Sequence, residues 1–179
     1  MNWDKLTFKA VDQQNWKDLE SLFESRGGPH NCWCMVWRKK EGKDISKKEG
    51  KKEALKDYVE RNIPIGLLCY QDHNPIAWCS IASRESYKNL GGDDTKENVW
   101  SIACFFIKRP FRNINLTSKL IEQAILYAQK NGARYLEAYP VEKDSPSYRF
   151  MGFRPSFEKV GFDFVHMAGK RRHVMIKKI

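Results

Sequence analysis

One stretch, residues 99–132, constrains the fold of this chain more than any other. An apolar run rich in β-branched and aromatic residues fills 99–107; it is too short for a buried helix and predicts a buried strand. A basic turn follows, and from Leu116 to Ala128 apolar residues recur at helical spacing, with charged and amide residues on the other face. The stretch therefore predicts a strand, a basic turn and a helix in immediate succession, with Gly132 in the expected C-terminal stop.

The turn at 108–115 is a candidate phosphate site. It carries Lys108, Arg109 and Arg112 and leads directly into the predicted helix. Unpaired backbone N–H groups and the positive end of the helix dipole meet at such a point, where a phosphate group is stabilised. An ordinary crossover with a solvated basic loop has the same pattern, so this stretch alone leaves both interpretations open.

The remaining periodicity indicates a chain that alternates between strands and helices. Strand, helix and strand around 99–141 imply a parallel pair with a right-handed crossover. Ser46 and Glu49 have the spacing of a capping box at the start of a lysine-rich helix. The predicted elements are helices over 14–26 and 46–62, and strands over 5–10, 65–70, 76–83, 133–141, 162–167 and 173–178.

The basic turn resembles the signature of the GNAT N-acetyltransferases, which use acetyl-CoA. In that family, Arg/Gln-x-x-Gly-x-Gly/Ala joins a strand to a helix, and its backbone cradles the CoA pyrophosphate. Arg112 fits the first position. Asn115 and Thr117 stand where the two small residues belong, and Asn113 replaces a further common glycine. The motif in this chain is therefore a degenerate form of the family's signature.

Two further segments resemble the same family. Residues 66–83 are similar to its central hairpin, and residues 157–162, FEKVGF, are similar to its recurrent Tyr-Glu-Lys-x-Gly-Phe segment. The resemblance covers most of residues 64–164. It implies a single α/β (α+β) domain over 1–179, in which a mixed central β-sheet is flanked by helices. Residues 1–62 would then form the acceptor side, and 63–179 the CoA-binding core with a C-terminal hairpin.

The resemblance also implies the ligand and the residues that hold it. Acetyl-CoA would be the co-substrate, and no metal is expected. The candidate cofactor-binding residues span the end of the strand and the basic turn: Phe106, Ile107, Arg112, Asn113, Ile114, Asn115, Leu116, Thr117 and Ser118.

Acetyl transfer from a thioester requires a neutral amine, a stabilised oxyanion and a proton for the leaving thiolate. Family members often use a tyrosine as the proton donor at the first position of the FEKVGF-like segment, but here that residue is Phe157. The phenols nearest in sequence are Tyr139 and Tyr148. Glu137 shares a strand face with Tyr139, because alternate residues point the same way, and is the candidate base. Alternatively, Tyr139 lies in the core and Glu137 pairs with a lysine.

Residues 30–38, HNCWCMVWR, contain a His-x-Cys-x-Cys pattern. A zinc site requires four donors, usually in two spaced pairs, and the chain has no second pair. The segment is instead predicted to pack on the sheet or to line a substrate cleft. Within the resemblance, Trp33, Trp37 and Arg38 are the candidate substrate contacts.

The formal net charge of +10 is typical of a protein that binds a negatively charged partner. The lysines concentrate in 39–56, interspersed with glutamates, and in 170–178, without a nucleic-acid-binding motif. A polyphosphate cofactor also benefits from this charge, so nucleic acid is not the expected partner. The chain has no apolar span and no signal-peptide centre, and its five cysteines are an odd number. These features favour a cytoplasmic location with reduced cysteines and no membrane partner.

The sequence therefore predicts an enzyme, an acyltransferase that moves an acetyl group from acetyl-CoA to an amine acceptor, either a small molecule or a peptide. The alternative is a catalytically weak GNAT-like module that binds acyl-CoA or a small molecule, which the missing glycines and Phe157 favour. The sequence leaves both a monomer and a homodimer open.

Overall fold

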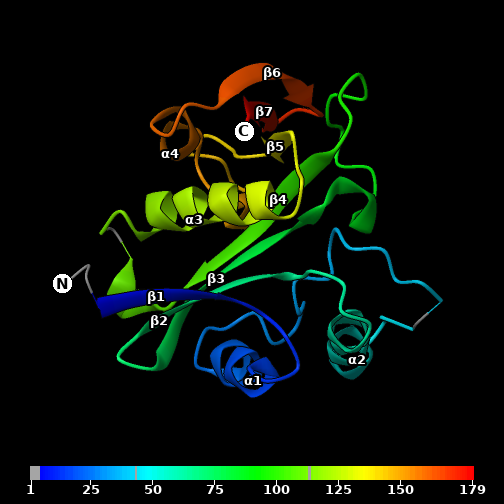
Figure 1. Ribbon diagram of the computed structural model, residues 1–179, viewed down its shortest axis with the longest axis vertical. Helices are drawn as coiled ribbons and strands as arrows, with labels where there is room; N and C mark the ends of the chain where they lie inside the picture. Colours follow the sequence, from blue (N-terminus) through cyan, green and yellow to red (C-terminus); the bar gives the residue numbers. More distant parts are fainter. Residues whose placement is uncertain (1–4, 43, 113) are drawn as a thin grey trace.

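The computed structural model describes residues 5–42, 44–112 and 114–179 (Figure 1). Within these residues, seven strands form one mixed sheet in the order β1-β2-β3-β4-β5-β7-β6. The strands are β1 (Leu6–Ala10), β2 (Gly66–Gln71), β3 (Asn74–Ser83), β4 (Val99–Ile107), β5 (Tyr135–Ala138), β6 (Asp163–Ala168) and β7 (Arg172–Lys178). The α-helices are α1 (Trp16–Glu24), α2 (Lys48–Glu60), α3 (Leu116–Lys130) and α4 (Arg154–Glu158). The mixed sheet flanked by helices confirms the predicted fold class.

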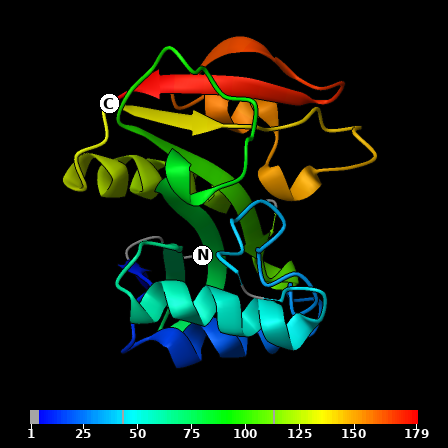
Figure 2. The ribbon, with the colours of Figure 1, turned by 90° about the vertical axis from the view of Figure 1, so that its right-hand side faces the viewer.

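Helices cover both faces of the sheet (Figures 1 and 2). Leu67 and Cys69 of β2 pack in the cluster that includes α3, whereas Leu68 and Tyr70 pack in the cluster that includes α1 and α2. This division follows from the two-residue period of a strand, which points neighbouring side chains to opposite faces. Because both faces are covered, the central strands are apolar at nearly every position.

The one parallel pair among the described strands, β4 with β5, separates along its length. β4 pairs with β5 only from Val99 to Ile102, although on its other edge it pairs with β3 as far as Ile107. β5 ends at Ala138, and Val141 beyond it pairs instead with Phe153. Residues 103–107 of β4 therefore have no strand partner on the side that faces β5.

The structure confirms the strand at 99–107 and the helix that follows the basic turn, and it corrects two details. The capping box at Ser46 does not form: the Ser46 N–H donates to Asp44 Oδ1 at 2.9 Å, and the helix begins after Lys47. The strand predicted over 133–141 is shorter, because it ends before Pro140, which has no N–H to donate to a neighbouring strand.

Candidate active site

A groove of about 780 Å³ lies beside the unpaired part of β4. The end of β4 and the start of α3 form one wall, and the segment from Lys143 to Ser156 forms the other. The 3₁₀ helix Arg149–Met151 packs against β4 and fixes this second wall. The lining residues are Phe105, Phe106, Ile107, Phe111, Arg112, Asn115, Leu116, Thr117, Ser118, Lys143, Arg149, Phe150, Gly152, Phe153 and Ser156.

The start of α3 presents free backbone donors to the groove. The Lys119 N–H donates to the Asn115 carbonyl at 3.4 Å, and among the described residues the amides of Leu116 and Ser118 have no backbone acceptor one turn earlier. Asn115 itself has a φ of 58°, in the left-handed region that glycine and asparagine reach most readily. This backbone shape is the one expected of a glycine at the same position of the signature.

The side chains of the groove add positive charge to these donors. Arg112, Lys143 and Arg149 line it, and none of the described lining residues is a carboxylate. Arg112 Nε donates to the Ile107 carbonyl at 2.9 Å, which ties the guanidinium to the end of β4. Arg149 Nη1 donates to the Lys143 carbonyl at 2.6 Å and so braces the opposite wall. The groove is therefore suited to a polyanion.

Of the described residues predicted to bind the cofactor, all but Ile114 line this groove. Phe106, Ile107, Arg112 and the run 115–118 are lining residues. Ile114 is half-buried and packs against the core cluster that includes α3. Asn113 lies outside the described residues.

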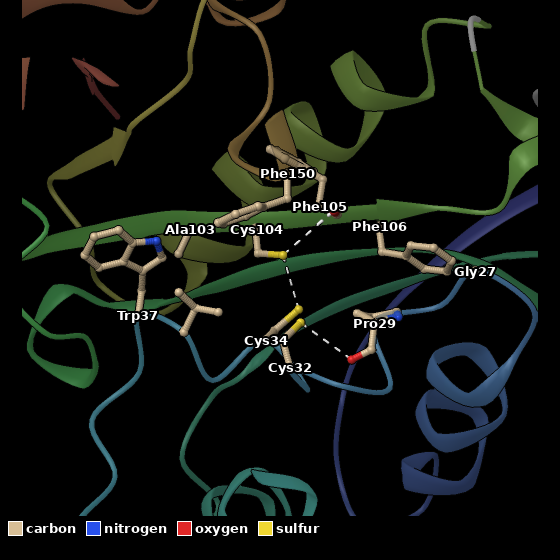
Figure 3. A pocket seen from close by; sticks show the side chains of 11 residues that line it. Gly27, Pro29, Cys32, Cys34, Trp37, Ala103, Cys104, Phe105, Phe106 and Phe150 are labelled. Atoms are coloured by element: carbon tan, nitrogen blue, oxygen red, sulfur yellow. Dashed lines mark hydrogen bonds between the residues drawn. The ribbon is translucent and has the colours of Figure 1, made fainter. Parts of the chain in front are cut away.

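A smaller pocket of about 160 Å³ adjoins the groove, and the two share Phe105, Phe106 and Phe150 (Figure 3). It lies between β4 and the segment that carries Cys32, Cys34 and Trp37, and the Cys34 and Cys104 sulfur atoms are 3.2 Å apart across it. The lining residues are Gly27, Pro29, Cys32, Cys34, Val36, Trp37, Ala103, Cys104, Phe105, Phe106 and Phe150.

Of the three predicted substrate contacts, Trp37 lines this pocket. Its indole nitrogen is buried and has no hydrogen-bond partner among the described residues. Trp33 is instead buried against the Trp16 and Phe23 rings, at centroid distances of 6.0 and 5.3 Å. The structure therefore brings only Trp37 to the pocket wall and places Trp33 in the core.

Arg38, the third predicted substrate contact, is fully buried. Its guanidinium donates to the Ile65 carbonyl and to Tyr87 Oη at 3.1 Å, and lies 4.6 Å from the centroid of the Tyr87 ring. A side chain enclosed in this way has no surface to offer a substrate. Its position favours a structural role.

The predicted catalytic pair does share a face, since Tyr139 Oη donates to Glu137 Oε2 at 2.8 Å. Both residues are fully buried, and neither lines the groove or the pocket. Glu137 pairs with Arg84 at 3.1 Å and accepts the Asp93 N–H at 2.8 Å, so it holds the loop between β3 and β4. Burial raises the pKa of Tyr139 well above its usual range, which opposes loss of its proton. These contacts favour a structural role for the pair.

Tyr148, the remaining catalytic candidate, lies near both the groove and the smaller pocket. It is 37% exposed and precedes the 3₁₀ helix with a left-handed φ of 60°. Its ring lies 6.3 Å from the rings of both Trp37 and Phe150. Because Phe150 lines the groove and the pocket alike, Tyr148 is the predicted phenol that the structure brings closest to their junction.

Sequence reasoning missed the second wall of the groove. Lys143, Arg149 and Phe150 lie between the predicted strands 133–141 and 162–167, where no sequence pattern shows which distant residues they contact. The cationic and aromatic residues of 143–153 were the available signal, but the Val141–Phe153 bridge that folds them back toward β4 is a long-range feature.

The described residues contain no group of three or more histidine, cysteine, aspartate or glutamate side chains placed to hold a metal ion. Among the helices of the part of the chain described, none is long and apolar enough to cross a membrane.

Residues 7–153 match the model of the Acetyltransferase (GNAT) family. No functionally curated protein has significant sequence similarity to the chain. The fold is similar to that of the PaiA N-acetyltransferase from Thermoplasma acidophilum in complex with coenzyme A, with a TM-score of 0.60 and 14% identity over 97% of this chain and 99% of that one.

Two further solved structures have similar folds. The yncA protein of Salmonella typhimurium with its cofactor acetyl-CoA has a TM-score of 0.58 and 11% identity, covering 97% of this chain and 94% of that one. An agmatine N-acetyltransferase has a TM-score of 0.61 and 10% identity, covering 98% of this chain and all of that one (100%). At these identities the likeness concerns the fold.

Proposed function

The chain belongs to the GNAT acetyltransferase family, and from this premise we propose that it transfers an acetyl group from acetyl-CoA to the nitrogen of an amine. One observation carries the proposal: a cationic groove at a helix N-terminus opens onto an apolar pocket at the unpaired edge of a central strand. The groove suits a polyphosphate, and the adjoining pocket suits a second, uncharged reactant.

The phosphate groups of the co-substrate would lie against Arg112, Lys143 and Arg149 and the backbone amides of Leu116 and Ser118 at the start of α3. The pantetheine arm of CoA carries amide groups that need hydrogen-bond partners. Residues 103–107 of β4 offer such partners along the edge that β5 leaves unpaired. The same edge runs along the junction of groove and pocket, since Phe105 and Phe106 line both.

Bound acetyl-CoA supplies an activated acetyl thioester. Backbone N–H groups on the free edge of β4 can stabilise charge on the carbonyl oxygen. The apolar pocket favours the neutral amine, which is the nucleophilic form, and the proton that the nitrogen loses on acylation passes to solvent. We assign Tyr148 as the donor of the proton that the departing thiolate takes up. Much of the rate enhancement then comes from holding two reactants together.

A second candidate function is binding of acyl-CoA without efficient transfer. Phe157 occupies the position at which family members often have a tyrosine, and it is fully buried against Phe105 and Phe162, at ring distances of 6.1 and 5.3 Å. The position has thus become part of the core. Under this alternative, acetyl-CoA binds but no amine is acetylated.

Calorimetric titration of the full chain with acetyl-CoA tests the proposal. We expect Arg112→Ala to weaken binding about tenfold, the scale of one exposed charge-assisted hydrogen bond. Arg109→Ala is the matched control, because it removes the same charge from an exposed neighbour that does not line the groove. Tyr148→Phe should lower kcat while leaving acetyl-CoA affinity unchanged. Equal affinities for the two arginine variants would show that the groove is not the CoA site.

The acceptor class that fits this proposal is a small molecule or peptide with a free amine.

The free thiols bear on the location of the protein. They are Cys32, Cys34, Cys69, Cys79 and Cys104. The Cys34 and Cys104 sulfur atoms are 3.2 Å apart, and two thiols this close stay reduced in a reducing compartment. This is consistent with the expected cytoplasmic location.

A further inference from the structure

The smaller pocket restricts which amine the proposed enzyme can accept. Its described lining contains no charged side chain and combines small residues, aromatic rings and three cysteines (Figure 3). The hydrogen bond with Cys104 is the main cause that raises the pKa of the Cys34 thiol, and the hydrogen bond with Cys34, together with burial, raises that of Cys32. The Cys32 and Cys34 thiols are therefore neutral, and the described lining has no carboxylate that could pair with a positively charged ligand.

The volume of the pocket sets the size of the group that can enter. At about 160 Å³ it is close to the engineered apolar cavity of ~150 Å³ that binds benzene. A group of that size fills the space beside Trp37, Ala103 and Cys104. A longer chain would have to leave the pocket.

Fixed positive charges lie at the same end of the pocket as Trp37. The Arg172 guanidinium stacks 4.5 Å from the centroid of the Trp37 ring, and Lys88 Nζ donates to the Val36 carbonyl at 2.9 Å. A ligand with a second cationic group would meet repulsion here and find no carboxylate in the lining. The charge pattern therefore disfavours polyamines and guanidinium-bearing amines.

From these three features we infer that the acceptor is a primary amine attached to a single apolar group of about the size of a benzene ring, without a second positive charge. The inference rests on the proposed acetyl transfer and specifies its substrate class. Burial of the apolar group in a wall without charge also favours the uncharged amine over the ammonium ion, so the same pocket selects the acceptor and keeps it nucleophilic.

A pair of probe amines tests the inference with the full chain. 2-Phenylethylamine carries one amine and a phenyl group, whereas agmatine carries an amine and a guanidinium. We expect kcat/KM for 2-phenylethylamine to exceed that for agmatine at least tenfold, measured by mass spectrometry of the acetylated products. Val36→Asp places a carboxylate in the lining at a residue that is 47% exposed, so it is compatible with folding. It should reduce the preference at least tenfold.

Leu126→Asp is the matched control, since it makes a comparable change at a 56% exposed residue of α3 that lines neither the groove nor the smaller pocket. It should leave the preference unchanged. Better use of agmatine by the unmodified chain, or a preference that Val36→Asp does not alter, would overturn the inference while leaving acetyl transfer intact.

Failure of the proposed function has a different signature. It would appear as absent acetyl-CoA binding in the calorimeter, before any amine is added. The pocket is then tested directly by ¹⁹F NMR with 4-fluorophenethylamine, displaced by 2-phenylethylamine. Saturable binding that Val36→Asp weakens supports the acceptor class, and an absence of saturable binding overturns it.

Discussion

Replacing Glu137 by alanine should destabilise the protein without removing a catalytic group. The Glu137 carboxylate is fully buried and accepts two bonds from Arg84 Nη1, at 3.1 and 3.3 Å. It also accepts the Asp93 N–H and the Tyr139 hydroxyl, each at 2.8 Å. The substitution therefore leaves three donor groups, on Arg84, Asp93 and Tyr139, without the carboxylate that accepts their hydrogen bonds.

The expected magnitude follows from these contacts. Removing one partner of a buried ion pair costs about 3–5 kcal/mol, because the other charge is left without compensation. The Arg84 side chain is 25% exposed and keeps two backbone acceptors, the Asp93 and Lys96 carbonyls, so the low end of that range applies. We expect Glu137→Ala to lower the free energy of unfolding by about 3–4 kcal/mol. Glu137→Gln keeps one oxygen and should cost about 2 kcal/mol.

Gly92→Ala probes the same contact from the other side. A Cβ atom at this position would clash with Glu137 Oε2, so the loop or the carboxylate must shift. Glu142→Ala is the matched control: the Glu142 side chain is 50% exposed, and its partners Arg154 and His173 lie at 3.5 and 3.3 Å. A surface pair of this kind contributes about 0–1 kcal/mol.

Urea unfolding followed by tryptophan fluorescence gives the stabilities, and kcat/KM measured well below the unfolding transition gives the activity of the folded fraction. The structural role predicts a large loss of stability with activity retained per folded molecule. A Glu137→Gln variant that is as stable as the unmodified chain but inactive would refute this reasoning and restore Glu137 as the base.

Two further predictions concern the groove and the buried thiols. Asn115→Gly should tighten acetyl-CoA binding about fivefold in calorimetry, because glycine accepts the left-handed φ without strain and removes a Cβ from the lining; weaker binding would indicate that the asparagine side chain itself makes a contact. Burial raises the pKa of Cys69 to about 12 and that of Cys79 higher still, so these thiols stay neutral in the fold at a pH where the unfolded chain ionises them. Their contribution to stability is complete below about pH 8.5 and is lost above it, at about 1.4 kcal/mol per pH unit for each thiol. Urea unfolding between pH 8 and 10.5 measures this slope, and Cys69→Ala should reduce it by one thiol's share; an unchanged slope would contradict the assignment.

Local pattern was sufficient to predict the groove's first wall. The strand at 99–107, the basic turn and the helix from Leu116 are adjacent in sequence, so periodicity and stop signals place their residues together without knowledge of the rest of the chain. Asn115 is the clearest case. Its place in the signature is one where the family has a small residue, asparagine is among the few residues besides glycine that reach positive φ, and the structure gives Asn115 a φ of 58°.

Contacts between distant residues could not be predicted in this way. Glu137 meets Arg84 and Asp93 across separations of 53 and 44 residues, and strand periodicity says only that it shares a face with Tyr139. Whether that face opens on a cleft depends on the loop from Arg84 onward, which folds back over it. A buried carboxylate and a catalytic one therefore look alike in sequence, since burial and partners decide the role.

The side-chain directions in the segment that carries Trp33 and Trp37 could not be predicted for a different physical reason. Trp33 and Cys34 both have left-handed backbone conformations, with φ of 46° and 51°, and neither is a glycine. Such a turn breaks any two- or four-residue period, so the direction of one side chain no longer predicts that of the next. Trp33 turns toward Trp16 and Phe23, whereas Trp37 reaches the pocket beside Ala103. The wall that we propose to select the acceptor is thus built from a segment with no periodicity, so the sequence alone does not show which of its side chains meet β4.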